Sequence, residues 1–226
     1  MNFKSDNVHG CNLEILAGLA EAAKGTVDSY GDDPVTRRVE ARLAEVFEHE
    51  VTVFPMTTGS SVNALILASM VDPWGAVLAH PESHINVDEC GAPEMFTGGA
   101  KIIPIEGENA IMDAGSLKTA LDGYAFGFVH AVQPQAISMT QATEAGAVMS
   151  LDEIATLAGI AKDKGLKVHM DGARFANALV ALDCSPAEMT WKQGIDVLSF
   201  GATKNGCMAA EAAVFFNKDL AATTHY

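Results

Sequence analysis

Short apolar runs alternate with amphipathic segments along most of this chain, and the alternation leaves few folds open to it. The runs that read as strands are residues 51–55, 77–79, 101–104, the surroundings of Phe128 and Ile137, 166–171, 195–200 and 212–216. The segments with helical periodicity are residues 34–47, 62–70, a stretch after Ser83, 116–121, 151–164 and a stretch from Phe175. Strands that alternate with helices predict an α/β fold, with a mainly parallel sheet and helices on both faces. In such a fold a ligand binds at the carboxyl ends of the strands.

The chain reads as one unit, because no repeat, low-complexity tract or flexible linker divides it. Its 226 residues are 49% hydrophobic and 19% charged, which excludes a disordered chain. Residues 123–143 contain no charged residue and could resemble a membrane span. Because Gln133, Pro134 and Gln135 interrupt this stretch, it predicts two buried strands instead.

The net charge of −15 argues against partners with a negative surface. It disfavours nucleic acid and anionic membrane, so local donors must hold any anionic ligand. The first ten residues lack the basic patch and apolar run of a secretory signal. The four cysteines are scattered and no metal-ligand spacing occurs, which favours reduced thiols in a cytoplasmic protein without a metal site.

Several common catalytic motifs are absent: GxGxxG, GxxxxGK[ST] and GxSxG. Candidate residues instead follow the predicted strands. Thr58, Gly59, Ser60 and Ser61 lie between a strand and a helix, where they form either an anion site or an ordinary helix cap.

Three charged residues lie at or after the ends of later predicted strands. Asp171 ends the run 166–171 and Arg174 follows three residues later, either as functional groups or as a structural ion pair or helix cap. Lys204 follows residues 195–200 in the sequence GATKNG. It is either a partly desolvated amine that can attack a carbonyl or a solvated loop lysine.

The histidines differ in their predicted places. His84 comes just after a strand, on the expected ligand side, and is a functional candidate. His169 lies inside a strand and is expected to be a hydrogen-bonded core residue. His130 ends an apolar run, and its role stays open.

Together these segments resemble the threonine aldolases, in particular the low-specificity L-threonine and phenylserine types. The matching segments, in order, are Ser5-Asp6, YGDDP at 30–34, TGSS at 58–61, His84, DGAR at 171–174 and Thr203-Lys204. The resemblance covers the whole chain. It implies the large domain of an aspartate aminotransferase-like fold that depends on pyridoxal 5′-phosphate, within the aromatic amino acid β-eliminating lyase/threonine aldolase group.

The resemblance also implies a role for each matching residue. Lys204 would form the Schiff base with the cofactor, Asp171 would pair with its ring nitrogen, and His84 would stack on the ring. Gly59 and Ser60 would bind the phosphate. Arg174, which belongs to the cofactor-binding set, would also hold the substrate carboxylate together with Ser5, and His130 would lie near the substrate hydroxyl. His84, His130 and a water molecule are all candidates for the general base.

The implied reaction cleaves L-threonine, L-allo-threonine or a related β-hydroxy amino acid to glycine and an aldehyde. Alternatives are another pyridoxal-dependent β-eliminating lyase, or a fragment that binds the cofactor without turnover. The resemblance implies a homodimer or homotetramer, in which Tyr30 reaches a neighbouring subunit. We expect residues 1–226 to form a single large domain, with the family's smaller C-terminal domain absent or truncated. The sequence TQATEAG at 140–146 differs from the ENTHNG version of narrower members, so the resemblance does not fix the choice of substrate.

Overall fold

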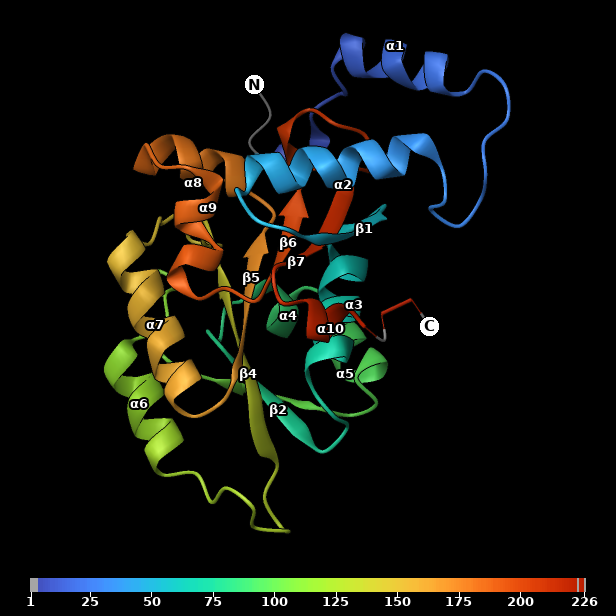
Figure 1. Ribbon diagram of the computed structural model, residues 1–226. Helices are drawn as coiled ribbons and strands as arrows, with labels where there is room; N and C mark the ends of the chain where they lie inside the picture. Colours follow the sequence, from blue (N-terminus) through green and yellow to red (C-terminus); the bar gives the residue numbers. More distant parts are fainter. Residues whose placement is uncertain (1–3, 223, 226) are drawn as a thin grey trace.

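The computed structural model describes residues 4–222 and 224–225 and places one twisted sheet between layers of helices (Figure 1). The strands are β1 (Thr52–Met56), β2 (Gly75–Ala79), β3 (Lys101–Pro104), β4 (Gln133–Thr140), β5 (Lys167–Gly172), β6 (Val197–Gly201) and β7 (Glu211–Phe215). The α-helices are α1 (Leu13–Ala22), α2 (Pro34–Val46), α3 (Gly59–Met70), α4 (His84–Val87), α5 (Ala92–Phe96), α6 (Ala114–Asp122), α7 (Leu151–Asp163), α8 (Phe175–Leu182), α9 (Pro186–Met189) and α10 (Lys218–Ala221). Short 3₁₀ helices are η1 (Asp6–Val8), η2 (Trp191–Gln193) and η3 (Thr203–Asn205).

The sheet order is β1-β7-β6-β5-β4-β2-β3, and β7 runs opposite to the other six of these strands. The pairs β6–β5, β5–β4, β4–β2 and β2–β3 are all parallel. The prediction of a mainly parallel α/β sheet is therefore confirmed. Because parallel strands end at the same edge, β4, β5 and β6 present their last residues side by side.

Two apolar layers hold the helices to the sheet. On one face α6, α7, α8 and α9 cover a large core that includes Phe47, Phe175 and Ile154, all at most 1% exposed. On the other face α3 and α10 pack on a second core that includes Ile66, Leu67 and Met70, which are fully buried. Burial of both faces explains why the strands read as nearly continuous apolar runs.

The start of α3 lies upstream of the predicted start at residue 62. Thr58 is the N-cap, and its hydroxyl accepts a hydrogen bond from the Ser61 N–H at 3.3 Å. The cap adds Gly59, Ser60 and Ser61 to the helix, so this polar turn is its first turn.

The strand predicted around Phe128 does not form. Residues 123–132 are an irregular loop, with Phe128 and Val129 54% and 88% exposed. The Gln133 side chain shapes this loop, because it accepts from the Gly127 N–H at 2.7 Å and donates to the Ala131 carbonyl at 2.9 Å. A lack of charge in residues 123–143 was therefore a poor guide to burial, and only the part from Gln133 to Thr140 is a strand.

Helix α1 lies outside these layers, beyond α2 (Figure 1). None of its residues is buried. One contact with the body of the molecule is the hydrogen bond from the Asn12 N–H to the Gly206 carbonyl at 2.9 Å. Within residues 4–222 and 224–225, no helix combines the length and apolar character that a membrane crossing requires.

Candidate active site

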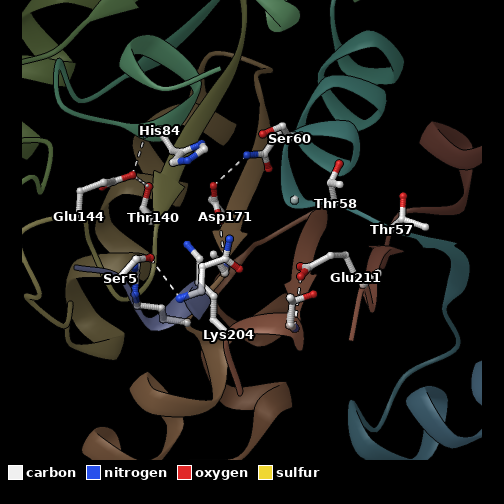
Figure 2. Close-up of a pocket in the computed structure, with 17 residues that line it drawn as sticks. Ser5, Thr57, Thr58, Ser60, His84, Thr140, Glu144, Asp171, Lys204 and Glu211 are labelled. Atoms are coloured by element: carbon white, nitrogen blue, oxygen red, sulfur yellow. Dashed lines mark hydrogen bonds between the residues drawn. The ribbon is translucent and has the colours of Figure 1, made fainter. Parts of the chain in front are cut away.

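A cavity of about 550 Å³ opens where the carboxyl ends of β4, β5 and β6 meet the amino end of α3 (Figure 2). It brings together seven of the residues that the sequence predicted for the site, from segments far apart in the chain: Ser5, Gly59, Ser60, His84, Asp171, Arg174 and Lys204. The cavity lies at the strand ends, where the sequence analysis expects the ligand site.

Two residues from the sequence analysis do not line this cavity. His130 lies in the irregular loop before β4, whereas Thr140 at the other end of that strand faces the cavity. The structure thus places His130 at the wrong end of β4 for a role near a bound substrate, because the apolar run that it was expected to end is not a strand. Tyr30 is fully exposed and also lies outside the cavity lining.

Asp171 is the buried acid of the site. It is 5% exposed, and its Oδ1 accepts from the Ala173 N–H at 3.0 Å while its Oδ2 accepts from Asn63 Nδ2 at 2.9 Å. Arg174 is not its partner, so the ion pair considered within DGAR is not formed. Asp171 is instead fixed by one backbone and one side-chain amide.

Arg174 binds the N-terminal segment. Its Nε and Nη2 atoms donate to the two carboxylate oxygens of Asp6, at 2.6 and 3.1 Å. This fork holds η1 at the mouth of the cavity, where the neighbouring Ser5 joins the lining. Asp6 therefore anchors this segment through Arg174, whereas Ser5 faces the cavity.

Lys204 lies in η3, directly after β6, and faces the cavity near Asp171 and His84 (Figure 2). The connection between β6 and η3 packs closely on the segment after β5. A Cβ atom at Gly201 would lie 2.8 Å from Ala173 Cα, so only glycine permits this approach. The amine of Lys204 is thereby placed beside the residues that follow Asp171.

His84 begins α4 and is held by two carboxylates. Its Nδ1–H donates to Glu89 Oε1 at 2.7 Å, and its backbone N–H donates to Glu144 Oε1 at 2.8 Å. The Glu89 side chain is fully buried, whereas that of His84 is 37% exposed. The hydrogen bond to Glu89 raises the pKa of His84 above its usual value, although burial opposes the shift.

Two acidic residues of the cavity were not found from the sequence. Glu144 follows β4 and accepts from Thr140 Oγ1 at 3.0 Å, and Glu211 begins β7 and accepts from the Thr203 N–H at 3.3 Å. Burial raises the pKa of both carboxyl groups. Glu144 was within reach of the sequence analysis, since it is a polar residue after a strand, like Asp171. Glu211 starts an antiparallel strand, so the rule of strand ends does not apply to it.

The amino end of α3 closes the cavity on a further side, with Thr57, Thr58, Gly59 and Ser60 in its wall (Figure 2). The first N–H groups of a helix lack acceptors within the helix and suit an anion. A Cβ atom built at Gly59 would meet nothing within 4 Å, so open space adjoins this turn.

A lysine amine, a buried carboxylate and a helix amino end therefore surround one cavity. This donor set fits pyridoxal 5′-phosphate, which needs an amine for its aldehyde, an anion for its ring nitrogen and N–H donors for its phosphate. Fold and site define the class of pyridoxal-phosphate enzymes with an aspartate aminotransferase-like fold. The chain belongs to the Beta-eliminating lyase family, whose sequence profile matches residues 2–226.

Individual relatives agree with this membership. The chain is 41% identical over 225 residues to the low specificity L-threonine aldolase of Pseudomonas aeruginosa, covering 99% of this chain and 64% of that protein. The structure of Leishmania major threonine aldolase superposes with a TM-score of 0.90 and 26% identity, covering 97% of this chain and 64% of that one. An archaeal alanine:glyoxylate aminotransferase, with a TM-score of 0.67 and 18% identity, shares the fold. The chain thus spans less than two thirds of the length of these relatives.

Proposed function

We propose that this protein is a pyridoxal 5′-phosphate-dependent threonine aldolase. It cleaves L-threonine, L-allo-threonine or a related β-hydroxy amino acid to glycine and an aldehyde. The observation that supports this most strongly is the convergence of Lys204, Asp171 and His84 on one cavity beside the amino end of α3. The likeness to two Pseudomonas proteins named low specificity L-threonine aldolase supports the choice of reaction.

The residues present would hold the cofactor at several points. Lys204 would bind its aldehyde carbon, Asp171 would face its ring nitrogen, His84 would lie on the ring, and Gly59 and Ser60 would bind its phosphate. When bound, the cofactor supplies an electron sink for the pair released as a bond at the substrate α-carbon breaks. A carboxylate at the ring nitrogen favours the protonated ring and so strengthens that sink.

Arg174 and Ser5 would bind the substrate carboxylate. A guanidinium has five N–H donors, and Asp6 takes one from Nε and one from Nη2. The remaining donors suit a carboxylate that enters the cavity. Because Asp6 fixes the plane of the guanidinium, it also orients those donors.

Proton transfer at the β-hydroxyl falls to His84 and Glu144. Both line the cavity, and the pKa of each is raised, that of His84 by its hydrogen bond to Glu89 and that of Glu144 by burial. Glu144 belongs to the segment 140–146, which differs from the ENTHNG version of the narrower members. We therefore propose that this segment contributes an acid–base group and affects substrate choice.

Another pyridoxal-dependent β-eliminating lyase would need the same Lys204 and Asp171. The two reactions differ in their products. Incubation of the loaded protein with L-threonine and with L-cysteine separates them, because an aldolase releases acetaldehyde from the former and a β-eliminating lyase releases pyruvate from the latter. A protein that binds cofactor but yields neither product would be a binding domain without turnover.

The proposal is tested by Lys204→Ala. The variant should lose the visible absorbance that survives dialysis and should lose aldol cleavage, because Lys204 supplies the covalent attachment. Lys192→Ala is the matched control, since Lys192 pairs with Glu48 on the surface away from the cavity. Unchanged absorbance in Lys204→Ala would remove Lys204 from its role.

We further propose a cytoplasmic homodimer or homotetramer. Exposed apolar side chains on α1 and α2 support self-association: Leu13 is 77% exposed, Leu19 48% and Val35 44%. These side chains would be buried against a second subunit.

A further inference from the structure

A buried chain of polar side chains runs beneath the cavity floor, from Ser138 through the centre of the sheet. The His169 ring lies between two hydroxyls, with Nδ1 2.9 Å from Ser138 Oγ and Nε2 2.9 Å from Ser199 Oγ. Ser199 Oγ donates to Asn63 Oδ1 at 2.6 Å. These side chains are at most 4% exposed, so each bond is shielded from water.

The donor and acceptor in each of these hydrogen bonds follow from the bond between Ser199 and Asn63. Ser199 gives its only proton to Asn63, so its oxygen must accept from His169 Nε2–H. His169 Nδ1 then carries no proton and accepts from Ser138. Burial also lowers the pKa of His169, to about 4, which agrees with a neutral ring.

Asn63 connects this buried hydrogen-bond network to the acidic residues of the site. Its Oδ1 is fixed by Ser199, so its Nδ2 must point the other way, where it donates to Asp171 Oδ2 at 2.9 Å and to Glu89 Oε1 at 2.8 Å. Glu89 Oε1 is also the acceptor for His84 Nδ1–H. One amide group therefore separates two buried carboxylates, and each of them belongs to a different part of the proposed cofactor site.

We infer that Asn63 is a positioning residue whose single amide bridges Asp171 and Glu89, and thereby fixes both the acid for the cofactor ring nitrogen and the anchor of His84. The amide supplies one hydrogen to each carboxylate. It also keeps their facing oxygens apart, which would otherwise repel each other in a site with little water. The inference deepens the proposed function, because the cofactor half of it rests on that function.

The test replaces the bridge by an acid of the same shape. In Asn63→Asp an oxygen faces Asp171 and Glu89, so three carboxyl groups crowd together and at least one must take up a proton. Other titratable groups around the network are His84, Lys204, His169, Glu144 and Glu211. A carboxyl group whose pKa is raised in the folded state destabilises that state increasingly as pH rises. The loss in melting temperature relative to the parent protein should therefore be larger at pH 8 than at pH 5.

Two further measurements separate positioning from simple packing. The dissociation constant for pyridoxal phosphate should rise about tenfold or more in Asn63→Asp. Adding Glu89→Gln should recover part of both losses, because the new amide can donate to the acid at position 63 and restores the original number of carboxylates. A residue that only fills space would give neither the pH dependence nor the recovery.

Asn177→Asp is the charge-matched control, because Asn177 is exposed on α8. It should change neither the pH dependence nor the cofactor affinity. The bridge is refuted if Asn63→Asp loses the same stability at pH 5 and pH 8, or if Glu89→Gln recovers nothing. If the parent protein binds no pyridoxal phosphate, the proposed function fails, whereas the melting experiments still decide whether Asn63 bridges the two acids.

Discussion

His84 owes its orientation to two carboxylates, one five residues and one 60 residues further along the chain. Its ring nitrogen is bound by the fully buried Glu89, and its backbone N–H is bound by Glu144 from the segment after β4. A charged acceptor strengthens the first of these bonds. The ring therefore has one nitrogen fixed by Glu89, and only Nε2 is left for a substrate or a water molecule.

Substitution of His84 separates its two proposed roles. His84→Phe should retain much of the cofactor affinity through an aromatic face, while turnover falls by about 10²- to 10⁴-fold as the acid–base group is lost. His84→Ala should weaken both. Cofactor titration and initial rates of aldehyde release provide the measurements. If both variants match the parent protein in both quantities, His84 does not belong to the site.

At the scale of elements, the ends of β5 and β6 approach each other through two glycines. A Cβ at Gly172 would lie 2.8 Å from the Ser199 carbonyl oxygen, and one at Gly201 would lie 2.9 Å from the Ala173 carbonyl oxygen. Each strand end thus packs on the backbone of the other. This contact sets the distance between Asp171, on one strand, and Lys204, which follows the other.

Gly201→Ala should disturb that distance. Because the contacting atoms are backbone, the strand ends must separate, and we expect a lower melting temperature together with a cofactor dissociation constant raised by about tenfold. Gly159→Ala is the control: Gly159 lies in α7 with nothing within 4 Å of its Cβ position, so alanine there should stabilise the protein by about 0.5–1 kcal/mol. Unchanged cofactor affinity in Gly201→Ala would show that the close contact of the strand ends does not control the position of Lys204.

At the scale of the whole molecule, the sheet buries a titratable ring between its two apolar layers. His169 of β5 is fully buried and hydrogen-bonded to side chains of β4 and β6. The sequence analysis expected such a core histidine, and the structure confirms it. Any loss of its neutral form disturbs three adjacent strands at once.

Acid should therefore unfold the protein partly through His169. Its pKa is lowered to about 4 in the folded state, so the unfolded chain binds more protons between pH 6.5 and pH 4. Its contribution to stability is complete above pH 6.5 and is lost as pH falls, by about 3 kcal/mol over that window. Urea unfolding of the parent protein and of His169→Gln checks this, since the variant should lose stability less steeply. Equal slopes would mean that other groups dominate.

Local chemistry made several features predictable. The strands β1 to β7 all follow from apolar runs, although the run around Phe128 predicted a strand that does not form. Helix α2 follows from a proline preceded by its capping acid Asp33. The positions of Asp171 and Lys204 at the site follow from their places after parallel strands. Each of these features depends on a pattern of a few neighbouring residues, and such a pattern can be read directly from the sequence.

The sequence by itself determined the α/β class, the end of the sheet that holds the site and most of the residues gathered there. Tertiary structure alone decided which partner each polar group has. Arg174 binds Asp6 across 168 positions, and the Asn63 amide binds Asp171 across 108 and Glu89 across 26. The loop with His130 lies at the opposite end of β4 from the site. Buried polar groups must find partners, and packing selects those partners from the whole chain, at distances that no local pattern records.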